Sequence, residues 1–290
     1  MRRYALVALF ASVILVAAQS HAALRCYSGF ETNAGVLLHG VNDGTGFIGG
    51  WQVEGNTSAL GYVIADVNPL EYGILQIKGN YAQGGHAYQT SGRSFDSLNA
   101  FGPWATNYAG IWSIGRYDSP PLWMSYLIRP LNATYTSKVG LDNTAAVFHD
   151  NAGIMRVQRT SSSGNKWVLS VMNNWLISTS AVEIVANATS FMVVKVQFGD
   201  PHTVDLYVNP AIGGAAPTTP DATLTFSTNG FYFREITWNP NNSAAQGWLD
   251  EVRLGDTFGD VAPVPEPAGV ILLALSAAAV AARRSVGLGR

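Results

Sequence analysis

The sequence predicts an all-β protein in which two antiparallel sheets pack face to face. Apolar residues recur at every second position in many short runs, and clusters of Gly, Pro, Asn and Ser separate these runs. No stretch between residues 23 and 263 has the 3.6-residue apolar period of a convincing amphipathic helix. Roughly a dozen strands without crossover helices are typical of a β-sandwich, because parallel strands need such connections.

The strands are expected in this order. Two early strands are predicted over 59–67 and 72–78. The run 122–128 is apolar on both parities, which predicts a central strand that is covered on both faces. Turn residues over 150–153 and 161–165 predict two tight hairpins. The remaining expected strands are 145–149, 154–159, 167–172, 191–198, 204–208, 222–227, 231–238 and 248–254, with a long loop over 209–221.

The composition excludes several classes of function. The net charge is −2 and only 12% of the residues are charged, so no basic patch indicates nucleic-acid binding. The 30 glycines and 12 tyrosines suit a turn-rich β protein. A single cysteine, Cys26, excludes an internal disulfide and a zinc site built from cysteines.

The N-terminus has the three parts of a secretory signal peptide. Arg2 and Arg3 form a basic region, 5–18 is an apolar region, and Ser20-His21-Ala22 fits the small-x-small cleavage pattern. We therefore expect residues 1–22 to be a signal peptide, with Sec export and cleavage before Ala23. Cys26 is not expected to carry a lipid, because Arg25 precedes it where a lipobox requires a small residue.

The C-terminus combines a Pro-Glu-Pro tripeptide, an uncharged apolar run over 268–282 and an arginine pair. The apolar run has 15 residues, and at about 1.5 Å per residue such a helix is shorter than a ~30 Å hydrocarbon core. Arginines after a span favour the cytoplasmic side. This pattern predicts a transmembrane helix with transient residence in the membrane; an ordinary tail anchor is the alternative. The residues of this segment are Pro265, Glu266, Pro267, Arg283 and Arg284.

These three parts in this order resemble a PEP-CTERM sorting signal. The resemblance implies that exosortase, a membrane-embedded cysteine protease, cuts near the tripeptide. The product is then expected at the cell surface or in the extracellular matrix, often within exopolysaccharide. The expected organisation is therefore a signal peptide over 1–22, a sandwich domain over 23–261 and a sorting signal over 262–290, with exosortase and the Sec machinery as partners.

The last predicted strand carries an unusual acid. Alternation places Trp248, Asp250, Val252 and Leu254 on one face, and Leu249, Glu251 and Arg253 on the other. Asp250 is thus expected to be buried among apolar residues. A buried carboxylate is costly unless it accepts hydrogen bonds or binds a cation, so a partner is expected.

Leu249-Asp250-Glu251-Val252-Arg253-Leu254 resembles the closing strand of laminin-G-like, concanavalin A-like sandwich domains. The stretches 139–150, 156–158 and 255–258 resemble such domains as well, so the similarity covers about 27–261. It implies a jelly-roll sandwich, often with one structural calcium near the joined chain ends. Asp250 and Glu31 are the candidate metal ligands. The alternative is that Asp250 accepts backbone N–H groups.

The carboxylates of the sequence bear on whether such a fold is an enzyme. Some concanavalin A-like sandwiches are glycoside hydrolases with two glutamates on one strand. Here no two glutamates before the sorting signal lie within five residues, and neighbours such as Asp250 and Glu251 point to opposite faces. The sequence therefore predicts that paired carboxylates on one face are missing and that the protein is not an enzyme. The six glutamates are Glu31, Glu54, Glu71, Glu183, Glu235 and Glu251.

A polysaccharide lyase is the enzymatic alternative. It needs a Tyr/His pair for proton transfer and an Arg or Gln that neutralises charge. The sequence lacks a Gln-Ile-His element typical of that class. The available residues are His86, His149, His202, Arg116, Arg156 and Arg159.

Aromatic residues gather between positions 104 and 123. The apolar face of a sugar ring stacks on an indole or phenol ring, so such a cluster predicts a glycan-binding face. Packing in the core is the alternative for each of them. Three functions stay open: a non-catalytic surface protein that binds carbohydrate or another surface component, a lyase, and a structural exopolysaccharide-associated protein without a defined ligand. The aromatic candidates are Trp104, Tyr108, Trp112, Tyr117 and Trp123.

Overall fold

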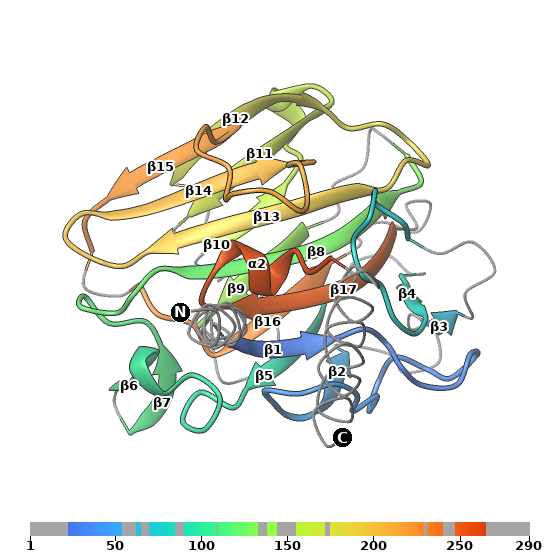
Figure 1. The fold of residues 1–290 in the computed structure, drawn as a ribbon, viewed down its shortest axis with the longest axis horizontal. Coiled ribbons are helices and arrows are strands. Elements are labelled where there is room, and N and C mark those ends of the chain that lie inside the picture. Colours follow the sequence, from blue (N-terminus) through green and yellow to red (C-terminus); the bar gives the residue numbers. More distant parts are fainter. Residues whose placement is uncertain are drawn as a thin grey trace, which may run out of the picture.

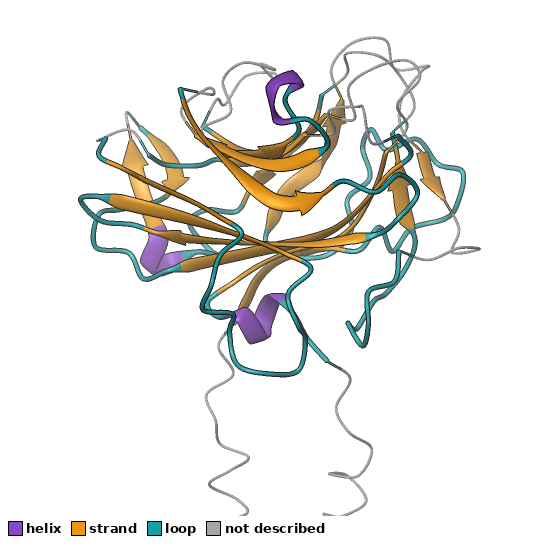
Figure 2. Ribbon diagram, turned by 90° about the horizontal axis from the view of Figure 1, so that it is seen from above, coloured by secondary structure: helices purple, strands orange, loops and turns teal. Residues whose placement is uncertain are grey.

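The predicted all-β sandwich of two antiparallel sheets is confirmed (Figures 1 and 2). The computed structural model describes residues 23–53, 62–64, 70–84, 90–108, 110–132, 138–143, 155–171, 175–228, 231–239 and 247–264. The predicted signal peptide, the sorting signal after Val264 and the predicted strand 145–149 lie outside these residues. Within the described residues, every strand pair is antiparallel.

One sheet has eight strands in the order β15-β14-β13-β8-β17-β4-β3, and β1 pairs with β17 beside this path. The predicted central strand is β8, which lies between β13 and β17 and is buried along nearly its whole length. The strands are β1 (Leu24–Ser28), β3 (Tyr62–Ile64), β4 (Tyr81–Gln83), β8 (Leu122–Pro130), β13 (Ser190–Gln197), β14 (His202–Val208), β15 (Ala222–Phe226) and β17 (Gly247–Gly255).

The other sheet has seven strands in the order β12-β11-β10-β9-β16-β5-β2, and a separate hairpin is formed by β6 (Ala105–Tyr108) and β7 (Ile111–Ile114). The predicted hairpin around 161–165 joins β10 to β11 through a short 3-10 turn at Ser161–Ser163. The strands are β2 (Phe47–Val53), β5 (Ser91–Phe95), β9 (Lys138–Asp142), β10 (Met155–Gln158), β11 (Lys166–Val171), β12 (Leu176–Glu183) and β16 (Glu235–Asn239).

The main core lies between the sheets and follows from the alternation along each strand. On β8, Met124, Tyr126 and Ile128 point into this core, whereas Trp123 and Leu127 point to the outer side of the sheet. Odd and even positions of β8 both need apolar residues, because both faces of the eight-stranded sheet are covered.

The prediction of a strand over 72–78 is wrong. Residues 72–78 form no strand; this segment crosses the outer face as a loop, and Gly73 has a φ of +51°. Leu70 and Leu75 are buried there in a second apolar cluster together with the helix α2 (Phe258–Val261). The apolar residues of the segment thus serve packing onto a sheet rather than pairing within one.

The outer face of the seven-stranded sheet is polar instead. Its side chains alternate with core residues such as Leu141 and Ile236, yet they are buried. Figure 2 shows that this sheet is strongly curved. We call this set the polar face: Asp142, Arg156, Gln158, Ser170, Glu235, Thr237 and Asn239.

The polar face corrects the expectation that paired carboxylates on one face are missing. Asp142 on β9 lies directly opposite Glu235 on β16 in the antiparallel register. Residues opposite each other in such a pair share a face, with Cβ atoms about 4.5–5.5 Å apart. The pair joins strands 93 positions apart in sequence, so a search for acids on a single strand could not find it.

The face assignment of β17 is also corrected. The register between β17 and β8 shifts between Asp250 and Arg253, and Glu251 has a φ of +53°, which marks a β-bulge. Leu249 and Val252 both reach the main core, whereas Trp248 packs on the outer cluster. The extra residue reverses the alternation, so Trp248 and Val252 lie on opposite faces rather than on the same one.

Candidate functional site

The five predicted glycan-binding aromatics divide into two groups. Trp104 and Trp123 are core residues: the Trp104 indole donates a 2.7 Å hydrogen bond to the carbonyl of Pro120, and Trp123 packs on Tyr207 and Phe258. Tyr108, Trp112 and Tyr117 are 49%, 45% and 44% exposed. Packing is therefore the role of two candidates, and three remain available to a ligand.

Tyr108 and Tyr117 line one pocket, which we call the aromatic pocket. It has a volume of about 310 Å³ and lies beside the β6–β7 hairpin. Trp112 does not line it. The lining residues are Thr106, Tyr108, Gly115, Arg116, Tyr117, Asp118, His202, Thr228, Phe231 and Tyr232.

The hairpin is held against the sandwich by backbone hydrogen bonds. Ile114 and Phe233 form an isolated antiparallel bridge in which each N–H donates to the other's carbonyl at 2.7 Å. The N–H of Gly115 donates to the carbonyl of Trp104 at 2.9 Å. These bonds place a surface hairpin beside a segment more than a hundred positions later in sequence.

The rings of the aromatic pocket are fixed by their neighbours. The Tyr108 and Tyr232 centroids are 4.4 Å apart, and Tyr117 stacks on His202 at 5.2 Å. The Tyr117 hydroxyl donates to the carbonyl of Thr228 at 3.0 Å. Burial raises the pKa of Tyr232, so its phenol stays protonated at neutral pH.

His202 is bound within the protein on both sides of its ring. It is buried, its Nδ1 accepts the N–H of Gly199 at 3.3 Å, and its Nε2 lies 2.9 Å from the carbonyl of Thr228. A carbonyl only accepts, so Nε2 carries the proton. With both nitrogens engaged, His202 has no free lone pair to act as a general base.

Only some of the candidate lyase residues lie in the aromatic pocket. Of these candidates, Arg116 and His202 meet in the aromatic pocket, while Arg156 lies on the polar face. Arg159 donates to the carbonyl of Gly164 at 2.6 Å, away from the pocket. His86 and His149 lie outside the described residues.

Sequence reasoning missed five polar or aromatic members of the aromatic pocket, namely Thr106, Asp118, Thr228, Phe231 and Tyr232. Asp118 forms a 3.1 Å ion pair with Arg116 at the exposed rim of the pocket. Tyr232 falls within the predicted strand 231–238, but β16 begins only at Glu235, and Phe233 bridges to Ile114 of the hairpin instead. No local sequence signal predicts that encounter.

The predicted metal ligands do not converge. Asp250 is buried as expected, and its Oδ1 accepts the backbone N–H of Glu251 at 2.7 Å. Glu31 is exposed and accepts the Tyr27 hydroxyl at 3.3 Å. Among the residues that the structure describes, no group of three or more His, Cys, Asp or Glu side chains could hold a metal ion. Calcium at Asp250 stays a prediction, and the hydrogen bond favours the alternative of a backbone acceptor.

Glu235 on the polar face has unusual electrostatics. It is 6% exposed, and its Oε1 has no hydrogen-bond partner within the described part of the chain. Burial, and then repulsion from the Asp142 charge, raises the pKa of Glu235 from 4.5 to about 8. Its carboxyl group is therefore largely protonated at neutral pH and can donate a proton.

The predicted sorting residues Pro265, Glu266, Pro267, Arg283 and Arg284 lie outside the described residues, so the sorting signal stays a prediction. Over the ranges that the structure describes, no helix is both long and apolar enough to cross a membrane.

The raised pKa of Glu235 predicts that the stability of the fold depends on pH. Because the folded state binds this proton more tightly than the unfolded chain, Glu235 stabilises the fold least at high pH. Its effect on the free energy of unfolding should decline as pH rises from 4.5 to about 8, by at most about 1.4 kcal/mol per pH unit. Urea unfolding across this window should show a steeper decline in the wild type than in Glu235→Gln. Parallel profiles for the two proteins would contradict the raised pKa.

The hydrogen bond of Asp250 predicts how stability responds to calcium. Asp250→Ala removes the acceptor of a buried N–H and should lower the free energy of unfolding by about 1–3 kcal/mol, equally in calcium and in EDTA. Thermal unfolding of wild type and variant in both buffers measures this. A wild-type melting temperature that rises with calcium, and does not rise in the variant, would instead identify Asp250 as a metal ligand.

Comparisons with known proteins give only distant similarities. No protein-family model matches the sequence, and no curated protein matches it significantly. An endo-β-1,4-glucuronan lyase from the fungus Trichoderma reesei is 10% identical, over 83% of this chain and 99% of that one, with a TM-score of 0.43. The globular domain of T. cruzi calreticulin is 9% identical over 82% and 90%, with a TM-score of 0.47. The carbohydrate recognition domain of Emp46p, in its metal-free form, is 6% identical over 71% and 88%, with a TM-score of 0.42. Such identities and TM-scores are too low to transfer a function.

Proposed function

We propose that this protein is an exported bacterial surface or matrix protein that binds carbohydrate in its aromatic pocket without cleaving it. The observation that carries this proposal is the pairing of two half-exposed tyrosines, Tyr108 and Tyr117, on the wall of one pocket of about 310 Å³. Arg116 and Asp118 lie at the same pocket and can hold hydroxyl groups. Ligand sites typically have volumes of about 300–1,000 Å³, so the pocket suits a small sugar unit.

Carbohydrate suits these walls for a physical reason. A sugar ring has an apolar face that packs on a phenol ring and an edge of hydroxyls that needs hydrogen bonds. The two tyrosine rings are already held by Tyr232 and His202, so binding need not order them. Preorganised side chains lose less conformational entropy on binding, which favours affinity.

The proposed absence of catalysis in the aromatic pocket is supported by the hydrogen bonds of two of its possible bases, His202 and Tyr117. The His202 nitrogens are both engaged, and the Tyr117 hydroxyl donates to a carbonyl. A lyase needs a base that can leave its partners and take a proton from the sugar. These fixed hydrogen bonds support recognition instead.

The proposed location comes from the sequence. Export through Sec, cleavage by exosortase and residence at the cell surface or in exopolysaccharide are inferred from residues 1–22 and 262–290. The first described residue, Ala23, and Pro263 line one pocket, so the two ends of the described domain lie close together. That arrangement supports attachment on one side of the sandwich.

A second candidate function is glycosidic-bond cleavage on the polar face. The observation that favours it is the opposed pair Asp142 and Glu235, and burial beside Asp142 raises the pKa of Glu235 to about 8. Glycosidases need one carboxylic acid that gives a proton to the leaving oxygen and one carboxylate that attacks the anomeric carbon or activates water. Glu235 suits the first role and Asp142 the second.

Binding in the aromatic pocket predicts the effect of removing its rings. Tyr108→Ala and Tyr117→Ala should each weaken glycan binding about tenfold, because each deletes a stacking surface. A glycan array with the purified protein identifies the ligand, and calorimetry measures the affinities. Trp175→Ala is the matched control, since Trp175 is 82% exposed and does not line the pocket. Equal losses in all three variants, or no ligand on the array, would refute the proposal.

The two candidate functions separate in an assay for new reducing ends. With the glycan that binds best, a non-catalytic protein should release none over many hours. If ends do appear, Glu235→Gln should abolish them, because Gln cannot give a proton, while Tyr117→Ala should retain the turnover number. Release that Glu235→Gln leaves unchanged would remove the polar face as a candidate active site.

A further inference from the structure

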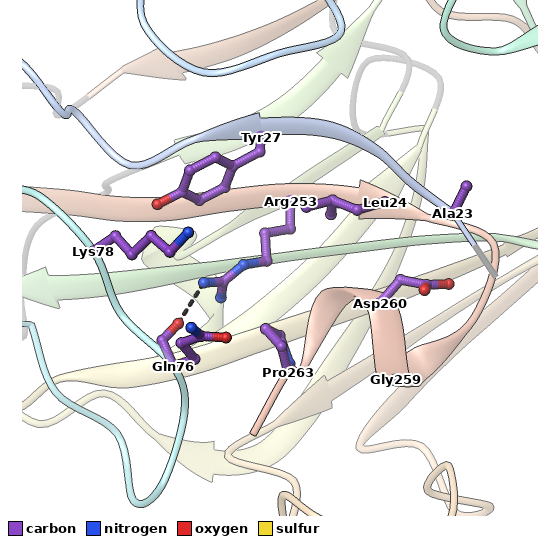
Figure 3. Close-up of a pocket in the computed structure, with 9 residues that line it drawn as sticks. All are labelled: Ala23, Leu24, Tyr27, Gln76, Lys78, Arg253, Gly259, Asp260 and Pro263. Carbon is purple, nitrogen blue, oxygen red and sulfur yellow. Dashed lines mark hydrogen bonds between the residues drawn. The ribbon is translucent and has the colours of Figure 1, made fainter. Parts of the chain in front are cut away.

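A larger pocket lies between the two ends of the described chain, and we call it the chain-end pocket. Its volume is about 490 Å³. Figure 3 shows its residues, which come from β1, the 70–78 loop, β17 and α2. They are Ala23, Leu24, Tyr27, Gln76, Lys78, Arg253, Gly259, Asp260 and Pro263.

Two cations meet at this pocket. Arg253 is only 3% exposed; its Nη2 donates to the carbonyl of Gln76 at 2.5 Å and to Glu251, but its Nη1 has no hydrogen-bond partner in the described chain. The backbone N–H of Lys78 donates to Glu251 at 2.5 Å. Its ammonium group has no ion-pair partner among the described residues, and Figure 3 shows its side chain on the same side as the guanidinium.

The two cations of the pocket differ in their partners. Arg253 pairs with Glu251, whereas Lys78 has no ion pair among the described residues, and the nearby carboxylate of Glu31 accepts the Tyr27 hydroxyl at 3.3 Å instead. The Asp260 carboxylate is turned away from both cations in Figure 3 and accepts the N–H of Thr257 at 2.8 Å. Burial, and then the Glu251 charge, raises the pKa of Tyr27 strongly, so its phenol adds no negative charge. A buried N–H without a partner is costly, and an anion would relieve that cost.

The remaining walls suit a ring that carries the anion. The Tyr27 ring covers the guanidinium at 5.4 Å, and Leu24 and Pro263 add apolar surface. A carboxylate matches the planar donors of a guanidinium better than a spherical ion does. We propose that the chain-end pocket binds the carboxylate of an acidic sugar, such as a uronic acid, between Lys78 and Arg253. This site is separate from the aromatic pocket and does not depend on it.

The test is a calorimetric or NMR titration of the purified protein with sodium glucuronate, glucose and inorganic phosphate. Glucuronate should bind at least tenfold more tightly than glucose or phosphate. Lys78→Gln should weaken glucuronate binding about tenfold or more, because it removes an exposed ammonium without disturbing the buried Glu251–Arg253 pair. Lys166→Gln on β11 is the control for loss of the same charge and should bind like the wild type. The loss of glucuronate affinity caused by Lys78→Gln should be equally large in a Tyr117→Ala background, which separates this site from the aromatic pocket.

Three results would overturn the proposal. Equal affinity for glucose and glucuronate would show that the charge is not recognised. Phosphate binding as tight as glucuronate would assign the pocket to anions in general rather than to a carboxylate. Unchanged glucuronate affinity in Lys78→Gln, or the same loss in Lys166→Gln, would place the binding elsewhere. Arg253 is left intact in every variant, because its removal would strand the buried Glu251 charge.

Discussion

The architecture depends on the bulge in β17. This strand pairs with β8 on one side, and with β4 and then β1 on the other, so it joins the eight-stranded sheet to both chain ends. At the bulge, two residues of β17 oppose one residue of β8, which lets Leu249 and Val252 both enter the main core. The same shift leaves Arg253 in the chain-end pocket beside its partner Glu251. Directly after the strand, Asp256 forms a 2.6 Å ion pair with Arg25 of β1, which ties the two ends of the described chain together.

The two outer faces of the sandwich have opposite chemistry. The eight-stranded sheet is covered on the outside by apolar side chains, including those of α2, so that face serves stability. The seven-stranded sheet has a polar outer face, and Asp142 and Glu235 lie there in one register. Buried polar groups cost stability unless they are satisfied, so a face rich in them is a feature that packing alone does not explain. The aromatic pocket lies apart from both, beside a hairpin outside the two sheets.

Sequence reasoning succeeded where alternation is regular and uninterrupted. It located β8, β13 and β14 and the long loop after β14, because their apolar pattern directly reports which faces are covered. It failed over 72–78, where apolar residues pack a loop onto a sheet. It also failed beyond Asp250, because one bulge residue reverses every later position and leaves no clear mark in the sequence.

The sites were harder to predict than the fold. The local cluster of aromatic residues predicts Tyr108 and Tyr117, but Tyr232 joins them only through the bridge between Ile114 and Phe233. The Asp142–Glu235 pair likewise exists only once β9 and β16 are neighbours. Such pairings depend on strand order, which the residue pattern of a single strand does not encode.

The central claim is that carbohydrate occupies the aromatic pocket. The most direct measurement is NMR of the protein with ring-labelled tyrosine, titrated with the glycan that it binds best. Signals of Tyr108, Tyr117 and Tyr232 should shift in proportion to saturation, while that of Tyr126, buried in the main core, should stay unchanged. Saturation of binding without any shift at these three tyrosines would contradict the account.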